Sequence, residues 1–115
     1  MGQKLLEWRG RIQEASVDVA TAATHELVAA VSGKTVRVYK IWLRLNAANN
    51  VTFKTGTTAL HGRLDYSASG EIIYDDPDGA FPITCTVSQA FNMTLTAAAQ
   101  VSGRVWYTQD AYTAT

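Results

Sequence analysis

From Ala15 onward, apolar and polar residues alternate along the chain with a period of two. In "ASVDVAT", for example, Val17 and Val19 alternate with Ser16 and Asp18. This alternation is typical of strands with one buried face. Similar runs follow, separated by turns rich in Gly, Asn, Asp, Ser and Pro: "HELVAAV", "TVRVYKIWLRLNA", "VTFKTGT", "TALHGRLDYSA", "EIIY", "ITCTVSQ", "FNMTLTAA" and "VSGRVWYTQ". The pattern predicts about eight or nine short strands, at the spacing of an all-β sandwich or barrel.

The longest run, "TVRVYKIWLRLNA", departs from a strict period of two. Val36 and Val38 share one parity, whereas Ile41, Leu43 and Leu45 share the other. One flat strand cannot bury both sets on the same side. A β-bulge or a crossover between sheets near Tyr39–Lys40 would reconcile them, because one extra residue reverses the facing. A strand covered on both faces is the alternative.

Glycines mark two further features. Thr55–Gly56 separates two strand-like runs and predicts a hairpin. Ser102–Gly103 lies within the last run and is a candidate for a second bulge.

Residues 1–14 differ from the rest and form a predicted N-terminal arm, ahead of a single domain over 15–115. Leu5, Trp8 and Ile12 are spaced i, i+3 and i+7, which places them on one side of a short helix, although an extended arm is equally compatible. Such a segment is marginal as an isolated helix. It either packs on its own domain or becomes ordered on a neighbouring subunit.

Composition places the chain among soluble globular proteins. Its 115 residues fit one domain, and the 10 Lys and Arg balance the 10 Asp and Glu. No dense basic patch of the kind that drives nucleic-acid binding is present, and no apolar run approaches the length of a membrane helix. The N-terminus lacks the apolar core of a secretion signal. We therefore expect synthesis in a cytoplasm, and neither nucleic acid nor membrane as a partner.

Residues that could carry catalysis are sparse and isolated. Cys85 is the only cysteine and reads as a small buried residue of a strand. His25 and His61 lie in different predicted strands, and no nucleophile elbow or phosphate-binding loop accompanies them. We predict no catalytic residue, no metal site and no cofactor.

The stretch "EIIYDDPDG" gathers acidic residues around a turn. Its carboxylates could hold calcium, but the stretch does not match an EF-hand loop, and an Asp-Pro-Asp-Gly turn satisfies its own backbone. The interpretation we favour is a contact loop for basic groups of a partner, formed by Asp75, Asp76 and Asp78.

Aromatic residues offer a second kind of contact. Trp42, Trp106, Tyr39 and Tyr107 fit core packing or a subunit interface. Tyr66 and Tyr74 beside Asp75 could instead form a sugar-binding platform. The motifs Asn50-Val51-Thr52 and Asn92-Met93-Thr94 match the glycosylation pattern, which we take as coincidence in a Thr-rich chain.

The cadence of "LVAAVSGKTVRVYKIWLRLNAANNVTFKTGTTAL", followed by Phe81–Pro82 and "FNMTLTAAAQVSGRVWY", resembles small virion structural proteins of tailed bacteriophages and prophages. The likeness spans about Leu27 to Tyr107. It implies a compact antiparallel β-sandwich, jelly-roll-like, on a virion. The acidic loop and the arm depart from the pattern of similar chains.

From this resemblance we expect a capsid decoration (cement) protein, a trimer that binds the major capsid protein and bridges neighbouring subunits on the capsid surface. A tail or fibre module, or a sandwich that recognises host carbohydrate, is the alternative; a small hydrolase would require His25 or His61 to converge with carboxylates. The expected arm anchors are Leu5, Leu6, Trp8 and Ile12, with Arg9 and Arg11 pairing with acidic capsid residues.

Overall fold

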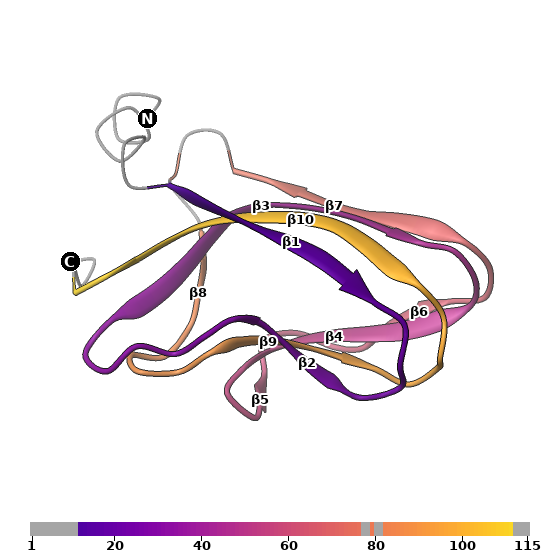
Figure 1. The fold of residues 1–115 in the computed structure, drawn as a ribbon, viewed down its shortest axis with the longest axis horizontal. Helices are drawn as coiled ribbons and strands as arrows, with labels where there is room; N and C mark the ends of the chain where they lie inside the picture. Colours follow the sequence, from indigo (N-terminus) through magenta and orange to yellow (C-terminus); the bar gives the residue numbers. More distant parts are fainter. Residues whose placement is uncertain (1–11, 77–78, 80–81, 112–115) are drawn as a thin grey trace.

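The computed structural model describes residues 12–76, 79 and 82–111, and these residues form two antiparallel β-sheets packed face to face (Figure 1). Sheet A has the order β1-β10-β3-β7, and β8 also pairs with β3. Its strands are β1 (Gln13–Val19), β3 (Thr35–Leu45), β7 (Gly70–Asp75), β8 (Ile83–Thr84) and β10 (Val101–Asp110). Sheet B has the order β2-β9-β4-β5, and β6 also pairs with β4. Its strands are β2 (Thr24–Val28), β4 (Asn49–Thr55), β5 (Thr58–Ala59), β6 (Leu64–Tyr66) and β9 (Phe91–Leu95).

The strand pairings are nested. The first strand pairs with the last (β1 with β10), β2 pairs with β9, β3 pairs with β7 and β8, and β4 pairs with β5 and β6. Successive outer pairs alternate between the two sheets, so the chain is one long hairpin rolled into a sandwich. This is the topology of a jelly roll. The predicted all-β sandwich is confirmed.

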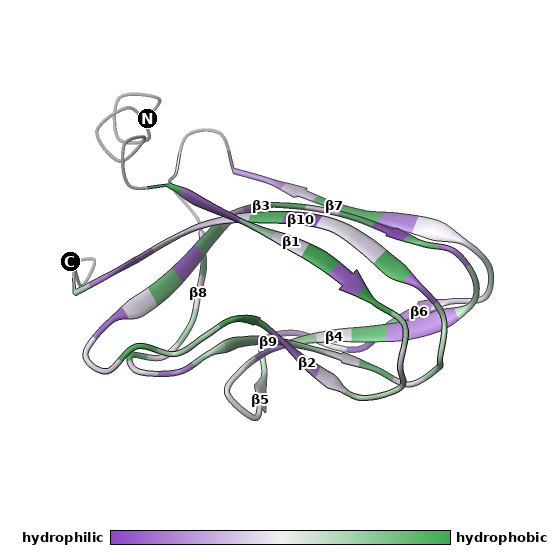
Figure 2. Cartoon of the chain, viewed as in Figure 1, coloured by the Kyte–Doolittle hydropathy of each residue, from purple (hydrophilic) through white to green (hydrophobic). Residues whose placement is uncertain are grey.

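The core lies between the inner faces of the two sheets. Hydrophobic and hydrophilic positions alternate along the strands (Figure 2). Phe53 of β4 and Phe91 of β9 stack with ring centroids 5.5 Å apart and an interplanar angle of 8°. Such aromatic pairs add to the free energy of burial. Sheet A contributes mainly β-branched and leucine side chains to this core: Val36, Val38, Ile41, Leu43, Leu45, Val101 and Val105.

The irregular parity of β3 is resolved by a bulge at the predicted place. Lys40 lies opposite Trp106 of β10 and Val38 lies opposite Tyr107, so Tyr39 has no opposite residue in β10. The extra residue lets valines before the bulge and leucines after it face the same core. The first half of β3 is also covered on both faces, as the alternative interpretation predicted, since Arg37 and Tyr39 on its outer face are each only 3% exposed.

Gly103 is required by a close approach of two strands. Residues 102 and 103 keep a continuous register with β3, so the predicted bulge at Ser102–Gly103 is wrong. Gly103 has φ +149°, and a Cβ atom there would lie 1.9 Å from the carbonyl oxygen of Trp42. Only glycine allows the backbones of β10 and β3 to pass at this distance.

The predicted hairpin at Thr55–Gly56 is confirmed. Thr55 pairs with Thr58, which leaves Gly56 and Thr57 as a two-residue turn between β4 and β5. Gly56 takes a positive φ of +58° at the first turn position, as a type II′ turn requires.

The domain begins slightly earlier than the sequence suggested. β1 starts at Gln13, so the strand includes the last two residues of the predicted arm, and Ile12 precedes it half-buried. The other predicted anchors, namely Leu5, Leu6, Trp8, Arg9 and Arg11, lie outside the described residues. None of the described segments is a helix with the length and apolar character needed to cross a membrane.

Candidate functional site

One end of sheet A carries the described residues of both regions that the sequence singled out for partner contact. The register aligns Asp75 of β7, Lys40 of β3, Trp106 of β10 and Glu14 of β1 in one row across the sheet. Four adjacent strands span only about 14 Å. Figure 1 shows that β1 begins and β7 ends at this same end of the sandwich. Ile12, the one predicted anchor among the described residues, therefore precedes β1 at the same end of the sheet as Asp75, about 14 Å across it.

The acidic residues of this loop take different environments. Asp75 is exposed, whereas Asp76 is buried. The Asp76 amide donates to the carbonyl oxygen of Tyr39 at 2.8 Å, which ties the end of β7 to the bulge of β3. Asp78 lies outside the described residues. Asp75 is thus the described acid of the loop that is open to a partner.

Behind this end lies a buried polar cluster on the outer side of β3. Arg37 is almost fully buried, and its Nη1 atom lies 3.4 Å from Oδ1 of Asp110. Burial raises the pKa of the Tyr39 hydroxyl, against a hydrogen bond with Thr108 and the positive charge of Arg37, which lower it; Asp110 and Asp76 raise it further. The pair of Arg37 with the partly exposed Asp110 joins β3 to β10 at this end of the sheet.

Tyr74 belongs to the same neighbourhood. Burial raises the pKa of its hydroxyl, and the carboxylate of Asp76 adds to the shift. Both tyrosines are therefore neutral structural groups at physiological pH.

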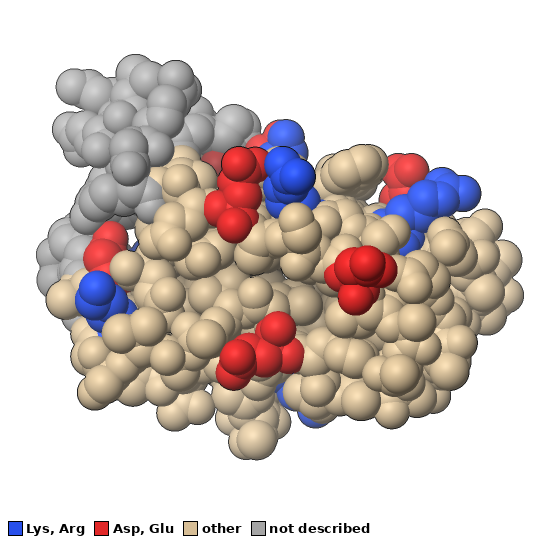
Figure 3. Space-filling view, viewed as in Figure 1, with Lys and Arg blue, Asp and Glu red and all other residues tan. Residues whose placement is uncertain are grey.

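The outer face of sheet A carries an exposed apolar pair beside these groups. Trp42 of β3 and Ile73 of β7 lie opposite each other and are 50% and 67% exposed. Charged residues surround them: Arg44 pairs with Glu71 at 3.5 Å, and Arg104 pairs with Glu14 at 3.1 Å. Figure 3 shows acidic and basic side chains side by side along the sheet A side of the molecule.

Lys40, on the same face, has an aromatic partner. Its ammonium lies 5.1 Å from the centroid of the Trp106 ring. A cation at this distance from an aromatic ring is attracted to its π-face. The row that carries Asp75 and Glu14 thus holds a fixed positive charge between them.

The sequence analysis missed Ile73 and left Trp42 between two roles. Trp42 occupies a position of its strand that points away from the core, since its neighbours Ile41 and Leu43 both face the core. An aromatic residue at a solvent-facing position was a signal that could have identified this surface. Ile73 gives a weaker signal, because "EIIY" places two apolar residues in succession and only Ile72 is buried.

His61 completes the hydrogen bonding of a strand. Its Nε2 atom accepts from the Phe53 amide at 3.1 Å, and its Nδ1 atom bonds the carbonyl oxygen of Gly62. The proton therefore sits on Nδ1. The imidazole fills the gap in the edge of β4 between β5 and β6, where no backbone carbonyl reaches the Phe53 amide. His25 lies on another strand, β2, and its Nε2 bonds the Thr21 carbonyl at 2.9 Å.

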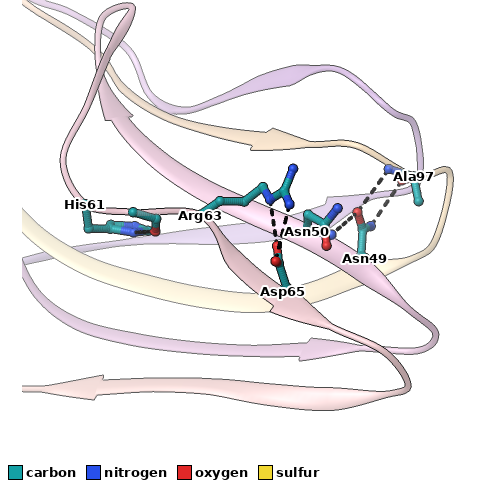
Figure 4. Close-up of polar contacts among 7 residues, drawn as sticks. Asn49, Asn50, His61, Arg63, Asp65 and Ala97 are labelled. Atoms are coloured by element: carbon teal, nitrogen blue, oxygen red, sulfur yellow. Dashed lines mark hydrogen bonds and ion pairs between the residues drawn. The ribbon is translucent and has the colours of Figure 1, made fainter.

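Nearby polar groups are likewise used within the fold (Figure 4). Asn49 is buried, and its side chain bonds the Ala97 carbonyl at 3.1 Å and the Ala97 amide at 3.0 Å. Arg63 and Asp65 form an exposed ion pair of 2.7 Å. The side-chain nitrogen of Asn92 donates to the Gly56 carbonyl at 2.8 Å. A glycan on the Asn92-Met93-Thr94 motif would be attached to this same side-chain nitrogen.

The two tyrosines of the expected sugar platform lie on different strands, Tyr66 on β6 of sheet B and Tyr74 on β7 of sheet A, and both pack against the core. The Tyr66 hydroxyl donates to the Glu71 carbonyl at 3.3 Å.

Cys85 is buried as predicted, but it follows β8 and does not lie in a strand, so that part of the prediction is wrong. Burial raises the pKa of its thiol to about 11. In the part of the chain that the structure describes, no three His, Cys, Asp or Glu residues lie together in a way that could hold a metal ion.

Comparisons of the chain with family models, with curated proteins and with solved structures found no match.

Proposed function

We propose that the protein is a bacteriophage virion structural protein, a capsid decoration protein that binds the assembled shell and bridges neighbouring major capsid subunits. It acts by binding, without turnover. It attaches through the end of the sandwich at which β1 starts and β7 ends. The exposed body of the jelly roll then covers the shell surface.

The observation that supports this most is the row Asp75–Lys40–Trp106–Glu14. Two segments far apart in the sequence leave the sheet within about 14 Å of each other. The first was singled out because its pattern differs from the rest of the chain, and the second because it is acidic. We infer one attachment surface at this end of the sheet instead of two separate ones.

The chemistry of this end suits a protein surface. Asp75 and Glu14 offer exposed carboxylates, which would pair with basic groups of the shell and orient the encounter. Ile12 is the last apolar residue of the N-terminal segment that would be buried between capsid subunits. Stable attachment of this kind typically buries about 2,000 Å² or more, which a loop alone cannot supply.

The proposal is tested by cosedimentation of the full-length protein with capsids that lack it. Removal of residues 1–11 leaves β1 intact, so circular dichroism should report a folded sandwich that no longer sediments with shells. Asp75→Lys should weaken binding, whereas Glu26→Lys, an exposed acid on β2 of the other sheet, is the matched control and should not. Full binding by the truncated protein, or no binding by the intact one, would refute the proposal.

A further inference from the structure

The outer face of sheet A has a charge pattern that is complementary to itself. β7 presents an acid, an apolar residue and an acid along its exposed side, and β3 presents a base, an apolar residue and a base directly opposite. We call these the β7 column (Glu71, Ile73, Asp75) and the β3 column (Arg44, Trp42, Lys40), and the register pairs them residue by residue in this order.

All six side chains are exposed, and the apolar member is central in each column. An exposed tryptophan beside an exposed isoleucine, ringed by charges of both signs, has the composition of an interface centre with a polar rim. Single exposed apolar residues are ordinary, but a cross-strand pair of this size is a contiguous patch.

We propose that this face binds a second copy of the chain about a two-fold axis that runs parallel to the strands, between β3 and β7. Such an axis keeps the position along the strand and exchanges the two columns. Ile73 of each copy then meets Trp42 of the other. At either side of this centre the acids of one copy meet the bases of the other: Glu71 meets Arg44, and Asp75 meets Lys40.

The charges select this axis over the other two-fold arrangements of the same face. An axis perpendicular to the strands would set Lys40 against Arg44, and Glu71 against Asp75. An axis between β3 and β10 would set the acidic β7 column against the acidic edge of β1, which carries Glu14 and Asp18. Like charges in direct contact disfavour an interface by several kcal/mol.

The Arg44–Glu71 pair within one chain does not use up these charges. The two side chains remain 56% and 45% exposed. In the dimer the four charges of two copies form an alternating square, in which every charge has two opposite neighbours. The face is small, so we expect a dissociation constant in the micromolar range, with the central aromatic contact contributing most of the affinity.

This interface rests on the face itself and not on capsid binding, and it differs from the three-fold assembly expected from the sequence. Asp75 belongs both to this face and to the proposed attachment end, so the pairing is tested with variants at Arg44, Glu71 and Trp42. Attachment is measured by cosedimentation with shells, and pairing by the mass of the free protein in solution.

Sedimentation equilibrium of the full-length protein tests the pairing. The wild type should show a monomer–dimer equilibrium. Arg44→Glu and Glu71→Arg should each be monomeric, because each places like charges across the axis. Mixed together, these two variants should form a heterodimer, since the carboxylate introduced at position 44 of one copy then faces the guanidinium introduced at position 71 of the other, and the remaining pair is unchanged. A pairing confined to one chain cannot be restored by mixing.

Two further variants make the outcome decisive. Trp42→Thr removes the central contact and retains a good strand former, so it should be monomeric at all concentrations. Lys54→Glu on the outer face of sheet B is the matched control and should dimerise as the wild type does. A wild type that stays monomeric to its solubility limit, a stable trimer, or a mixture of the two charge variants that stays monomeric would each overturn the inference. The inference would also be overturned if the wild type were monomeric and Trp42→Thr lost binding to shells, since this face would then bind the shell and not a second copy of the chain.

Discussion

At the scale of single residues, Cys85 shows how burial alone sets a chemical property. Its side chain is 3% exposed, and the loss of hydration raises the pKa of the thiol to about 11, although a hydrogen bond with Thr55 acts in the opposite direction. The thiol is therefore neutral and inert in the folded protein. Sequence composition predicted the burial of this residue, because unpaired cysteines behave as small apolar side chains.

The raised pKa of Cys85 makes the stability of the protein depend on alkaline pH. The ordinary value for a thiol is 9.0, so the unfolded chain loses its proton first. The stabilising contribution is fully present below about pH 9 and is lost as the pH rises through 11. Between about pH 8 and pH 10 the free energy of unfolding should fall by about 1 kcal/mol more in the wild type than in Cys85→Ala. Urea unfolding of both proteins measures this difference; identical slopes with pH would contradict it.

Gly103 gives the second residue-scale prediction. A methyl group here would overlap the Trp42 carbonyl oxygen, and φ +149° disfavours any other residue. Gly103→Ala should therefore lower the free energy of unfolding by about 2–4 kcal/mol. Gly62→Ala is the control, because nothing lies within 4 Å of its Cβ position. Equal stabilities of the two variants in urea titrations would show that the strands can separate without penalty.

At the scale of elements, β3 shows what a sequence can reveal about a strand. The core residues of β3 are even-numbered up to Val38 and odd-numbered from Ile41, and this change located the bulge to within one residue. Both sets can face the same core only if the strand contains one extra residue between them. The same reasoning failed at Ser102–Gly103. A glycine within a strand marks either a bulge or a close approach, and only the position of the neighbouring backbone distinguishes the two.

The bulge leads to a prediction about deletions. Removal of Lys40 leaves Tyr39 opposite Trp106 and restores a regular ladder, with every core residue of β3 still facing inward. The variant should fold, with a loss of about 3 kcal/mol or less. Removal of Trp42 instead turns Leu43 and Leu45 to the outside and should abolish folding. Thermal unfolding followed by circular dichroism compares them, and a cooperative transition in both variants would contradict the account.

At the scale of the whole molecule, the jelly roll determines which segments become neighbours. The nested pairings place the start of β1 and the end of β7 in the same row, and they set Trp42 beside Ile73. The period of two predicted strands and a sandwich or barrel. It contains no information about which strand pairs with which, because pairing depends on contacts between residues far apart in the chain. The role of His61 was not predicted for a different reason: it lies between β5 and β6 instead of in a strand, and its side chain bonds the amide of Phe53, eight residues earlier in β4.

The central claim is that this sandwich decorates a phage shell through the end that carries Ile12 and Asp75. Cryo-electron microscopy of phage particles produced together with this chain tests that proposal most directly. The account predicts density for a jelly roll on the outer surface of the capsid, with the end formed by the start of β1 and the end of β7 directed at the major capsid protein. Density on the tail or fibres, or a sandwich attached to the capsid by its opposite end, would contradict it.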